Sequence, residues 1–467
     1  MFINTKLFLL SIYPYPFIPL YLYTPIPLYP YSFIPLFLYT SMTLQEKDKA
    51  YIWHPFTQMK GAMDPIHIER AEGVHLYASD GRKFIDAVSS WWVNIHGHSN
   101  PVIAEAIARQ AREMEHVIFA GFTHTPAILL AEKLIEILPN DFAKVFYSDD
   151  GSTAVEVAIK TALQYWFNKG IPKRKIIAFN DAYHGDTFGA MSVGSRSVFN
   201  APFQELLFHV EHIPVPIGND IETCIERFTD IAKDNAAAAF IYEPLVQGAA
   251  GMVMYEPVHL ERLLSIAKAH NILCIADEVM TCFGRTGKLF ASDYLISKPD
   301  IICLSKGITG GFLPLGVTVC TQEIFDAFYD DKKSKALFHG HSYTANPIAC
   351  AAANASLELL LSSQCEDQIK MIAGHHSSFI DKVKSHSFVR NARQTGTIIA
   401  VELNTKEDSS YFNSITKDIY KYALDRGVLL RPLGNVIYCM PPYCINHAEL
   451  RAVYDVMEGI ITDFNQK

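Results

Sequence analysis

From residue 42 onward, the sequence predicts an α/β fold: a large domain with a mostly parallel sheet covered by helices, and a smaller α+β domain. Two observations support this prediction. Short apolar runs alternate with longer segments of helical periodicity through the middle of the chain, as strands and helices do in α/β domains. Beyond about residue 336, the pattern changes to an Ala-rich helical run followed by apolar segments at 395–403 and 427–442, which indicates the smaller domain.

The expected strands of the large domain are continuously apolar, so we expect both faces of each strand to be buried. Parallel sheets that are covered by helices on both faces have strands of this kind. The runs lie at 144–149, 175–181, 238–244, 272–278 and 300–306.

Segment 152–168 shows a clear helical pattern between two of these strands. Apolar residues recur along one side of it at Ala154, Val155, Ala158, Ile159, Ala162 and Leu163. Lys169 and Gly170 follow the segment, and Pro172 comes just beyond them, which is a typical helix stop signal.

The composition is that of a soluble globular protein, with 49% hydrophobic and 19% charged residues in a chain of 467. The formal net charge of −9 argues against a broad surface for nucleic acid or anionic membranes. The nine cysteines are scattered singly, and neither a C-x-x-C pair nor a zinc-ligand spacing occurs. We therefore expect free thiols in a reducing cytoplasm and no metal site.

The first 41 residues differ from the rest. No charged residue occurs from Leu7 to Gln45, and segments 13–24 and 29–40 repeat nearly the same Tyr/Pro-rich sequence. Prolines at this density break helices, which disfavours a membrane span, and the segment also fits a secretory signal poorly. We interpret residues 1–41 as a low-complexity appendage, either disordered or a mis-called start before Met42. Membrane attachment is the alternative.

Ligands in open α/β sheets lie beyond the carboxyl ends of the strands, so polar residues there are candidates for chemistry. Lys306 ends one run; burial would lower its pKa and free a nucleophilic amine, or the lysine simply returns the chain to solvent. Asp277 ends the preceding run, where its carboxylate either pairs with a protonated ring nitrogen or caps a helix. Residues 148–153 open a helix after a strand, which suits phosphate binding, although capping alone also explains them.

The strings around these residues make the combination specific. ADEVMTCFGRTGKLFASDY at 276–294 is followed by LSKGITGGFLPLG at 304–316, and DAYHGDTFGAMS at 181–192 and EPLVQGAAGM at 243–252 precede them. This set closely resembles the class III aminotransferases of fold-type I, from about Tyr51 to Met457. The resemblance implies pyridoxal 5′-phosphate as cofactor and a seven-stranded sheet in the large domain.

The resemblance also implies a domain arrangement in which both chain ends build the small domain. We expect its N-terminal part at 42–95, the large cofactor-binding domain at 96–345, and the C-terminal part of the small domain at 346–467.

Four further strings, at 51–59, 86–101, 151–166 and 427–443, look like the biotin-pathway members of the class. This resemblance implies a transaminase that carries an amino group from S-adenosylmethionine to 8-amino-7-oxononanoate and forms 7,8-diaminononanoate. L-Lysine as the donor and another class III ω-amino-acid aminotransferase remain alternatives. A decarboxylase or aminomutase on the same fold and a non-catalytic, membrane-tethered member are more distant ones.

The resemblance assigns roles at the matching positions. It implies that Lys306 links covalently to the cofactor and moves the proton, and that Asp277 pairs with the pyridine nitrogen. Gly151 and Ser152 are expected to bind the phosphate, and Tyr183 to pack on the ring and line the substrate pocket, where Lys306 also contacts the substrate.

The expected substrate site includes two tryptophans and an arginine. The resemblance implies that Trp91 and Trp92 wall the apolar chain of the keto acid and that Arg431 binds its distal carboxylate, a group that suits a forked guanidinium. An adjacent Trp pair is otherwise more often core, and Arg431 could be a surface ion pair. Phe56 stands where many users of S-adenosylmethionine have a tyrosine near the substrate, which bears on the choice of donor.

The segment 338–347 matches the part of the class that reaches across a dimer interface to the cofactor phosphate of the partner. Gly340, His341 and Ser342 occupy that place, although some biotin-pathway members have Pro-Thr where this chain has His341 and Ser342. We therefore expect a homodimer with shared active sites that acts on small molecules and binds neither nucleic acid nor membrane.

Overall fold

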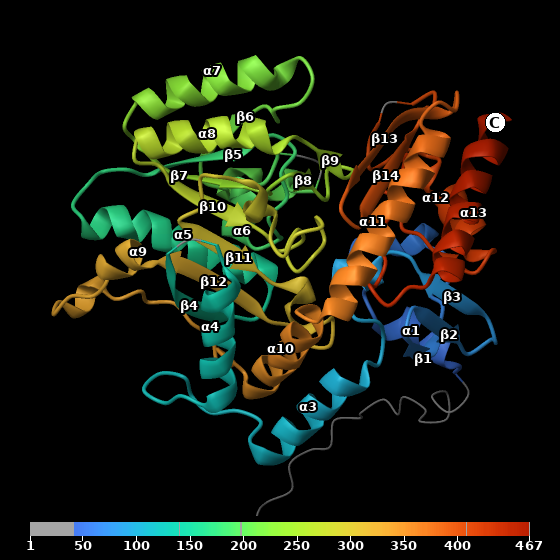
Figure 1. Ribbon diagram of the computed structural model, residues 1–467, viewed down its shortest axis with the longest axis horizontal. Helices are drawn as coiled ribbons and strands as arrows, with labels where there is room; N and C mark the ends of the chain where they lie inside the picture. The colour runs from blue at the N-terminus through green and yellow to red at the C-terminus, as the bar shows by residue number, and fades with distance from the viewer. Residues whose placement is uncertain (1–41, 140, 197–198, 408, 467) are drawn as a thin grey trace, which may run out of the picture. The chain divides into compact units, whose positions relative to one another are not determined.

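The computed structural model describes residues 42–466, apart from residues 140, 197–198 and 408 (Figure 1). These residues fall into two compact units, one ending at Ile66 and the other beginning at His67. The first unit contains helix α1 (Leu44–Tyr51) and the 3-10 turn η2 (Met59–Gly61). The Tyr/Pro-rich segment at 1–41 lies outside the described residues.

A seven-stranded sheet forms the centre of the second unit, in the order β4-β12-β11-β10-β7-β5-β6. The pairs formed by β6, β5, β7, β10 and β11 are parallel, whereas β12 runs antiparallel to both of its neighbours. The prediction of a mostly parallel, seven-stranded sheet is confirmed. The strands are β4 (Phe142–Ser148), β5 (Lys175–Phe179), β6 (Glu211–Ile213), β7 (Ala237–Tyr242), β10 (Leu273–Asp277), β11 (Ile301–Leu304) and β12 (Gly316–Thr321).

Helices cover both faces of this sheet. Successive side chains of a strand point to opposite sides, so a wholly apolar strand gives the sheet two apolar faces. Along β11, Ile301 and Cys303 belong to the apolar cluster of the face under α5. Ile302 and Leu304 belong to the large cluster on the other side. Helices α5 (Gly151–Asn168), α6 (Phe188–Val193) and α9 (Gln322–Asp326) contribute to the first cluster, and α4 (Thr125–Ile137), α7 (Asp220–Lys233) and α8 (Pro257–Ala269) to the second.

Helix α5 begins and ends where its local sequence dictates. Asp150 is the N-cap: its carboxylate accepts a 2.7 Å hydrogen bond from Thr153 N, and the Thr153 hydroxyl accepts one from Asp150 N. The helix ends before Gly170, whose φ of +71° lies in the left-handed region that glycine tolerates. The predicted helix 152–168 is therefore correct to within one residue.

Two further sheets flank the central one. One has the order β1-β2-β3-β15 and the other β13-β14-β16, and β8 and β9 form a hairpin. Their strands are β1 (Ile68–Glu72), β2 (His75–Ala78), β3 (Lys83–Asp86), β15 (Val428–Leu429), β13 (Val389–Thr395), β14 (Ile398–Leu403), β16 (Val436–Cys439), β8 (Val246–Gln247) and β9 (Val253–Met254). Because β15 pairs with β3, a strand from near the C-terminus completes a sheet from near the start of the second unit.

The remaining helices complete the second unit (Figure 1). They are the short turn α2 (Ser89–Trp92), α3 (Pro101–Glu113), α10 (Pro347–Leu360), α11 (Ser363–Val383), α12 (Thr416–Leu424) and α13 (His447–Asp463), with 3-10 turns η3 (Ala201–Leu206), η4 (Ala291–Tyr294), η5 (Lys306–Thr309), η6 (Lys333–Lys335) and η7 (Phe464–Gln466). Helix α10 packs Ala352 and Ala355 against Ile103 and Ala106 of α3. The domain boundaries near residues 95 and 345 stay predictions.

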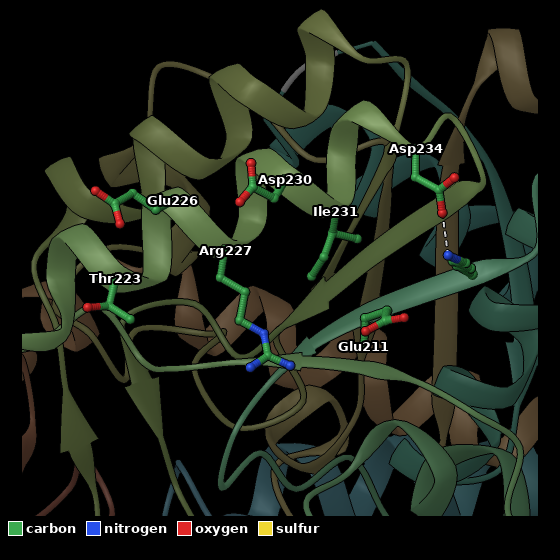
Figure 2. A pocket seen from close by; sticks show the side chains of 8 residues that line it. Glu211, Thr223, Glu226, Arg227, Asp230, Ile231 and Asp234 are labelled. Atoms are coloured by element: carbon green, nitrogen blue, oxygen red, sulfur yellow. Dashed lines mark hydrogen bonds and ion pairs between the residues drawn. The ribbon is translucent and has the colours of Figure 1, made fainter.

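The outer edge of the central sheet carries a surface hollow between β6 and α7 (Figure 2). Charges of both signs line it, and Lys175 of β5 pairs with Asp234 at the end of α7. None of the residues predicted to carry chemistry is among the described residues that line this hollow. The candidate site lies instead at the ends of the central strands, near Asp277 and Lys306.

Candidate active site at the strand ends

Lys306 follows β11 after a single residue and opens the 3-10 turn η5. Its φ of +46° lies in the left-handed region, which costs a non-glycine residue roughly 1–2 kcal/mol and is typical of functional positions. Burial lowers the pKa of Lys306, although the nearby carboxylates of Asp277 and Glu243 act in the opposite direction. A lowered pKa makes the neutral, nucleophilic amine more accessible.

Asp277 ends β10, the strand that pairs with β11, and only 5% of its surface is exposed. Its Oδ2 lies 2.6 Å from Nδ1 of the buried His184. Its Oδ1 accepts a 3.0 Å hydrogen bond from Val279 N. Of the two His184 ring nitrogens, Nε2 has no hydrogen-bond partner among the described residues although it is buried. The carboxylate is thus held from two sides, and one imidazole nitrogen remains available.

Tyr183 and Glu243 tie neighbouring strand ends together. Glu243, just after β7, accepts hydrogen bonds from Tyr183 N at 3.1 Å and from Gly248 N at 2.9 Å. Burial raises the pKa of Glu243 to about 7. The Tyr183 hydroxyl donates to Asp186 at 3.0 Å, and burial and the Asp186 carboxylate raise the pKa of Tyr183. The phenol therefore keeps its proton.

The turn between β4 and α5 packs tightly against the Tyr183 segment. Ser152 Oγ accepts a 3.3 Å hydrogen bond from Asp186 N. A Cβ added to Gly185 would lie 2.0 Å from Ser152 Oγ, and one added to Gly151 would lie 2.6 Å from a methyl of Val279. The first N–H groups of a helix have no intrahelical acceptor and attract anions. Glycine at these two positions therefore lets the neighbouring segments pack closely beside the helix start.

The residues from Ser89 to Trp92 form a left-handed turn without any glycine. Their φ angles are +50°, +45°, +73° and +75°. Each costs roughly 1–2 kcal/mol relative to ordinary backbone. Such strain persists only where the surroundings hold it, and it clusters at functional sites. The turn therefore presents Trp91 and Trp92 in directions that an unstrained helix would not allow.

The two tryptophans connect Lys306 to Arg431. Lys306 Nζ lies 5.0 Å from the ring centroid of Trp92, whose indole N–H donates to the Tyr438 hydroxyl at 3.0 Å. The Arg431 guanidinium lies 3.9 Å over the ring of the neighbouring Trp91. An amine and a guanidinium thus each lie against one of two consecutive indoles, of which Trp92 is almost fully buried and Trp91 partly buried.

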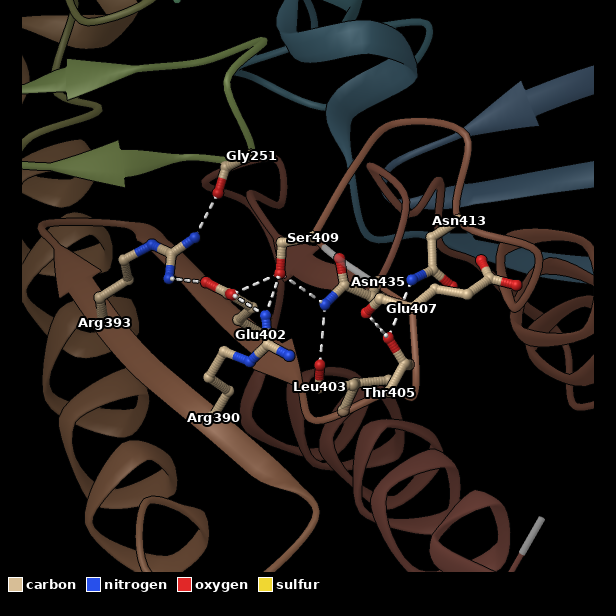
Figure 3. Close-up of polar contacts among 10 residues, drawn as sticks. All are labelled: Gly251, Arg390, Arg393, Glu402, Leu403, Thr405, Glu407, Ser409, Asn413 and Asn435. Atoms are coloured by element: carbon tan, nitrogen blue, oxygen red, sulfur yellow. Dashed lines mark hydrogen bonds and ion pairs between the residues drawn. The ribbon is translucent and has the colours of Figure 1, made fainter.

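Hydrogen bonds from Arg393, in the sheet β13-β14-β16, hold a loop that borders Trp92. A Cβ at Gly248 would lie 3.1 Å from the Trp92 ring, so the loop after β8 passes close to it. Arg393 of β13 donates to the carbonyls of Gly251 and Met252 in this loop and pairs with Glu402 at 3.3 Å (Figure 3).

The structure does not gather all the predicted residues. Gly340 and Ser342 are exposed. The imidazole of His341 approaches the turn between β4 and α5, where its Nε2 lies 3.9 Å from Asp149 Oδ1. Phe56 belongs to the first compact unit. Their predicted roles toward phosphate and substrate stay predictions.

Three residues that sequence reasoning left without a role take part in this arrangement: His184, Asp186 and Tyr438. His184 and Asp186 stand beside Tyr183 in DAYHGD, directly after a strand, which was a usable signal. Tyr438 gave no such signal, because it lies inside the apolar strand β16 and meets Trp92 only through the fold.

The chain belongs to the class III aminotransferases, whose family model (aminotransferase class-III) matches residues 57–461. It is 49% identical to an adenosylmethionine-8-amino-7-oxononanoate aminotransferase of Synechococcus elongatus, over 88% of this chain and 99% of that protein. Among the described residues, no helix is both long and apolar enough to cross a membrane.

Solved structures agree with this family. The crystal structure of the adenosylmethionine-8-amino-7-oxononanoate aminotransferase of Methanocaldococcus jannaschii is similar at a TM-score of 0.85 and 38% identity, over 90% of this chain and 98% of that one. An amine transaminase from an uncultivated Pseudomonas species, solved in its pyridoxal-phosphate-bound form, is similar at a TM-score of 0.83 and 30% identity, over 88% and 98%.

Proposed function

We propose that this protein is a pyridoxal-phosphate-dependent aminotransferase that transfers the amino group of S-adenosylmethionine to 8-amino-7-oxononanoate, which yields 7,8-diaminononanoate for biotin biosynthesis. The observation that carries the proposal is the pair of consecutive indoles, with the Lys306 amine near Trp92 and the Arg431 guanidinium over Trp91. It suits a substrate that has a reacting carbon at one end and a carboxylate at the other. The family and the names of the similar proteins point the same way.

The residues present fit the cofactor. Its phosphate would lie at the start of α5, where the first backbone N–H groups of the helix lack intrahelical acceptors and Ser152 offers a hydroxyl. Its ring nitrogen would face Asp277, and its aldehyde carbon would meet Lys306. When bound, pyridoxal phosphate supplies an electron sink that lets an amino group pass from donor to acceptor.

The chain contributes positioning and proton transfer. The Lys306 amine, with its pKa lowered by burial, would take the proton from the carbon that bears the donor's amino group and pass it to the cofactor carbon. In the second half it would move a proton the opposite way, onto the carbon that receives the amino group. His184 orients the Asp277 carboxylate by donating through Nδ1. Tyr183, held through its backbone by Glu243 and through its hydroxyl by Asp186, keeps a fixed place beside these groups.

Arg431 and the tryptophans determine which acceptor fits. A guanidinium stacked on Trp91 keeps its N–H fork in one plane, which suits the distal carboxylate of a keto acid. The indoles cover the intervening methylene groups and exclude water from them.

We further propose that the active form is a cytoplasmic homodimer in which Gly340, His341 and Ser342 help to bind the cofactor phosphate of the partner subunit. The exposure of Gly340 and Ser342 supports this, as do the neighbouring Phe338 and Tyr343, which are 66% and 65% exposed. The nine unpaired cysteines fit a reducing compartment. A monomer that keeps full activity and cofactor would contradict the shared site.

The donor is tested by absorbance of the purified protein after reconstitution with pyridoxal phosphate. We expect S-adenosylmethionine to convert the cofactor band to that of the amine form, L-lysine to leave it unchanged, and later addition of 8-amino-7-oxononanoate to restore it with 7,8-diaminononanoate detected by mass spectrometry. Conversion by L-lysine alone would favour the alternative donor, which Phe56 in place of tyrosine keeps open. A bound cofactor that responds to neither donor would refute the biotin-pathway reaction.

A further inference from the structure

Asp86 lies beneath the left-handed turn and is fully buried. It ends β3 and stands opposite Leu429 of the parallel strand β15, two residues before Arg431. Ala87 N continues this pairing with a 3.2 Å hydrogen bond to Leu429 O. The carboxylate therefore sits where the chain that leads to the tryptophans and the chain that leads to Arg431 run side by side.

Three groups donate to this carboxylate. The Ser90 hydroxyl donates to Oδ2 at 2.6 Å, His98 Nε2 to the same oxygen at 2.9 Å, and Val88 N to Oδ1 at 3.2 Å. Asn94 Nδ2 lies 3.0 Å from His98 Nδ1, so a proton on Nε2 completes both contacts. Burial opposes ionisation of Asp86, but the hydrogen bonds from His98 and Ser90 outweigh it and keep the pKa of Asp86 below its ordinary value.

These contacts hold the strained turn at its centre. Ser90 stands immediately before Trp91, and its hydroxyl is tied to Asp86. Ser89 is tied separately, through its hydroxyl, to the carbonyl of Met440 at 2.8 Å. A turn of four left-handed residues would relax without such fastenings. Trp92 is held in addition by the hydrogen bond from its indole N–H to Tyr438.

We propose that Asp86 is a positioning residue for the substrate pocket: by accepting from Ser90 and His98, it holds the turn so that Trp91 stays beneath Arg431. This inference rests on the proposed function, because the pocket in question is the one that binds the acid end of the keto acid. Asp86 touches neither Lys306 nor Asp277 in the contacts described, so its effect is on binding of the acid rather than on the chemical step.

Asp86→Asn tests the inference, because the amide nearly preserves shape but turns its N–H groups toward at least one of the three donors, whichever way it lies. We expect the KM for 8-amino-7-oxononanoate to rise about 10-fold while kcat changes less than about 3-fold. Asp300→Asn is the control: Asp300 is a partly buried carboxyl that accepts from Cys274 N at 2.7 Å, and we expect its variant to keep the wild-type KM. An unchanged KM in Asp86→Asn would overturn the inference.

A second readout does not depend on turnover. The chain has four tryptophans, and we expect Asp86→Asn, without substrate, to lose part of the near-UV circular dichroism and to gain acrylamide quenching of tryptophan fluorescence relative to Asp300→Asn. Equal spectra and quenching in the two variants would overturn the positioning role of Asp86, even if the wild type proved inactive on the keto acid. If the wild type is inactive on the keto acid but the Asp86→Asn variant has altered spectra, the proposed function would be refuted and the positioning role of Asp86 would stand.

His98 provides a rescue test should Asp86→Asn fail to fold. His98→Gln keeps an N–H donor for the Asp86 carboxylate, whereas His98→Ala removes it. We expect His98→Ala to raise the KM for the keto acid and His98→Gln to recover most of the loss. Equal KM values for the two variants would overturn the inference.

Discussion

His184 Nδ1 lies 2.6 Å from Asp277 Oδ2, and both side chains are buried. The two residues come from different strand ends, since His184 follows β5 and Asp277 closes β10. A hydrogen bond to a buried carboxylate is shorter and stronger than a neutral one. The imidazole therefore fixes the carboxylate that is proposed to face the cofactor ring.

His184→Ala is expected to slow half-transamination by about 10- to 100-fold, because a hydrogen bond to a charged group contributes roughly 1.5–3 kcal/mol. The rate is measured by stopped-flow absorbance after mixing the cofactor-loaded protein with donor. His184→Asn is the matched control, since its amide can place an N–H near the position of Nδ1 and should recover part of the rate. Wild-type rates in His184→Ala would show that the contact has no role in the reaction.

Arg431→Met is expected to raise the KM for 8-amino-7-oxononanoate by about 10- to 100-fold, since it removes a charge-assisted contact to the distal carboxylate. Methionine retains an unbranched apolar chain over Trp91, so the packing on Trp91 should survive. The methyl ester of the keto acid provides the comparison: wild type and variant should differ little with it. A similar penalty with acid and ester would argue that Arg431 acts only through Trp91. Arg431→Lys should fall between, because it keeps the charge and loses the fork.

The large sheet was predictable because most of its strands appear as uninterrupted apolar runs, as strands buried on both faces do. All five expected runs overlap strands β4, β5, β7, β10 and β11. Strands β6 and β12 were not expected, since β6 has three residues, two of them polar, and β12 alternates apolar residues with threonine and glycine. Local pattern therefore follows the run of apolar residues and not burial itself. Strand β12 was missed although it is almost fully buried, whereas β4 was predicted although Lys144 in its middle is exposed.

The residues of the candidate site were predictable only where a local sequence pattern marks them. Lys306 and Asp277 each end an apolar run, which marks them. The contact between His184 and Asp277 depends on which strands lie side by side, and no local pattern specifies this for residues 93 positions apart. The left-handed turn at 89–92 was invisible for another reason: it contains no glycine, so nothing in its sequence indicates positive φ.

Arg393→Met is expected to lower the free energy of unfolding by about 3 kcal/mol, because it breaks a largely buried ion pair (Figure 3) and frees the carbonyls of Gly251 and Met252. Chemical denaturation measures the change. Arg390→Met is the matched control: Arg390 lies 3.5 Å from the same Glu402 but is 39% exposed, so its loss should cost less than about 1 kcal/mol. Equal losses in the two variants would show that burial of the Arg393 pair has no special weight.

Glu278 predicts how stability depends on pH. It is fully buried and accepts from Ser292 N at 2.7 Å and Ala291 N at 2.8 Å, and burial raises its pKa from 4.5 to about 7. Between these values the folded chain keeps a proton that the unfolded chain has lost. The contribution of Glu278 to stability is therefore full below pH 4.5 and is lost as the pH rises toward 7, at up to about 1.4 kcal/mol per pH unit.

Glu278→Gln removes this titration. We expect the free energy of unfolding of wild type minus that of the variant to fall steadily from pH 4.5 to 7 in urea denaturation series, and to stay level above pH 7. Glu261→Gln should behave oppositely: burial of Glu261 is outweighed by its hydrogen bonds from Ser297, so its pKa is lowered and its contribution disappears only as the pH drops below 4.5. A Glu278 difference that is flat across pH 4.5–7 would mean that the carboxyl is ionised in the folded protein throughout, with its N–H donors fully offsetting burial.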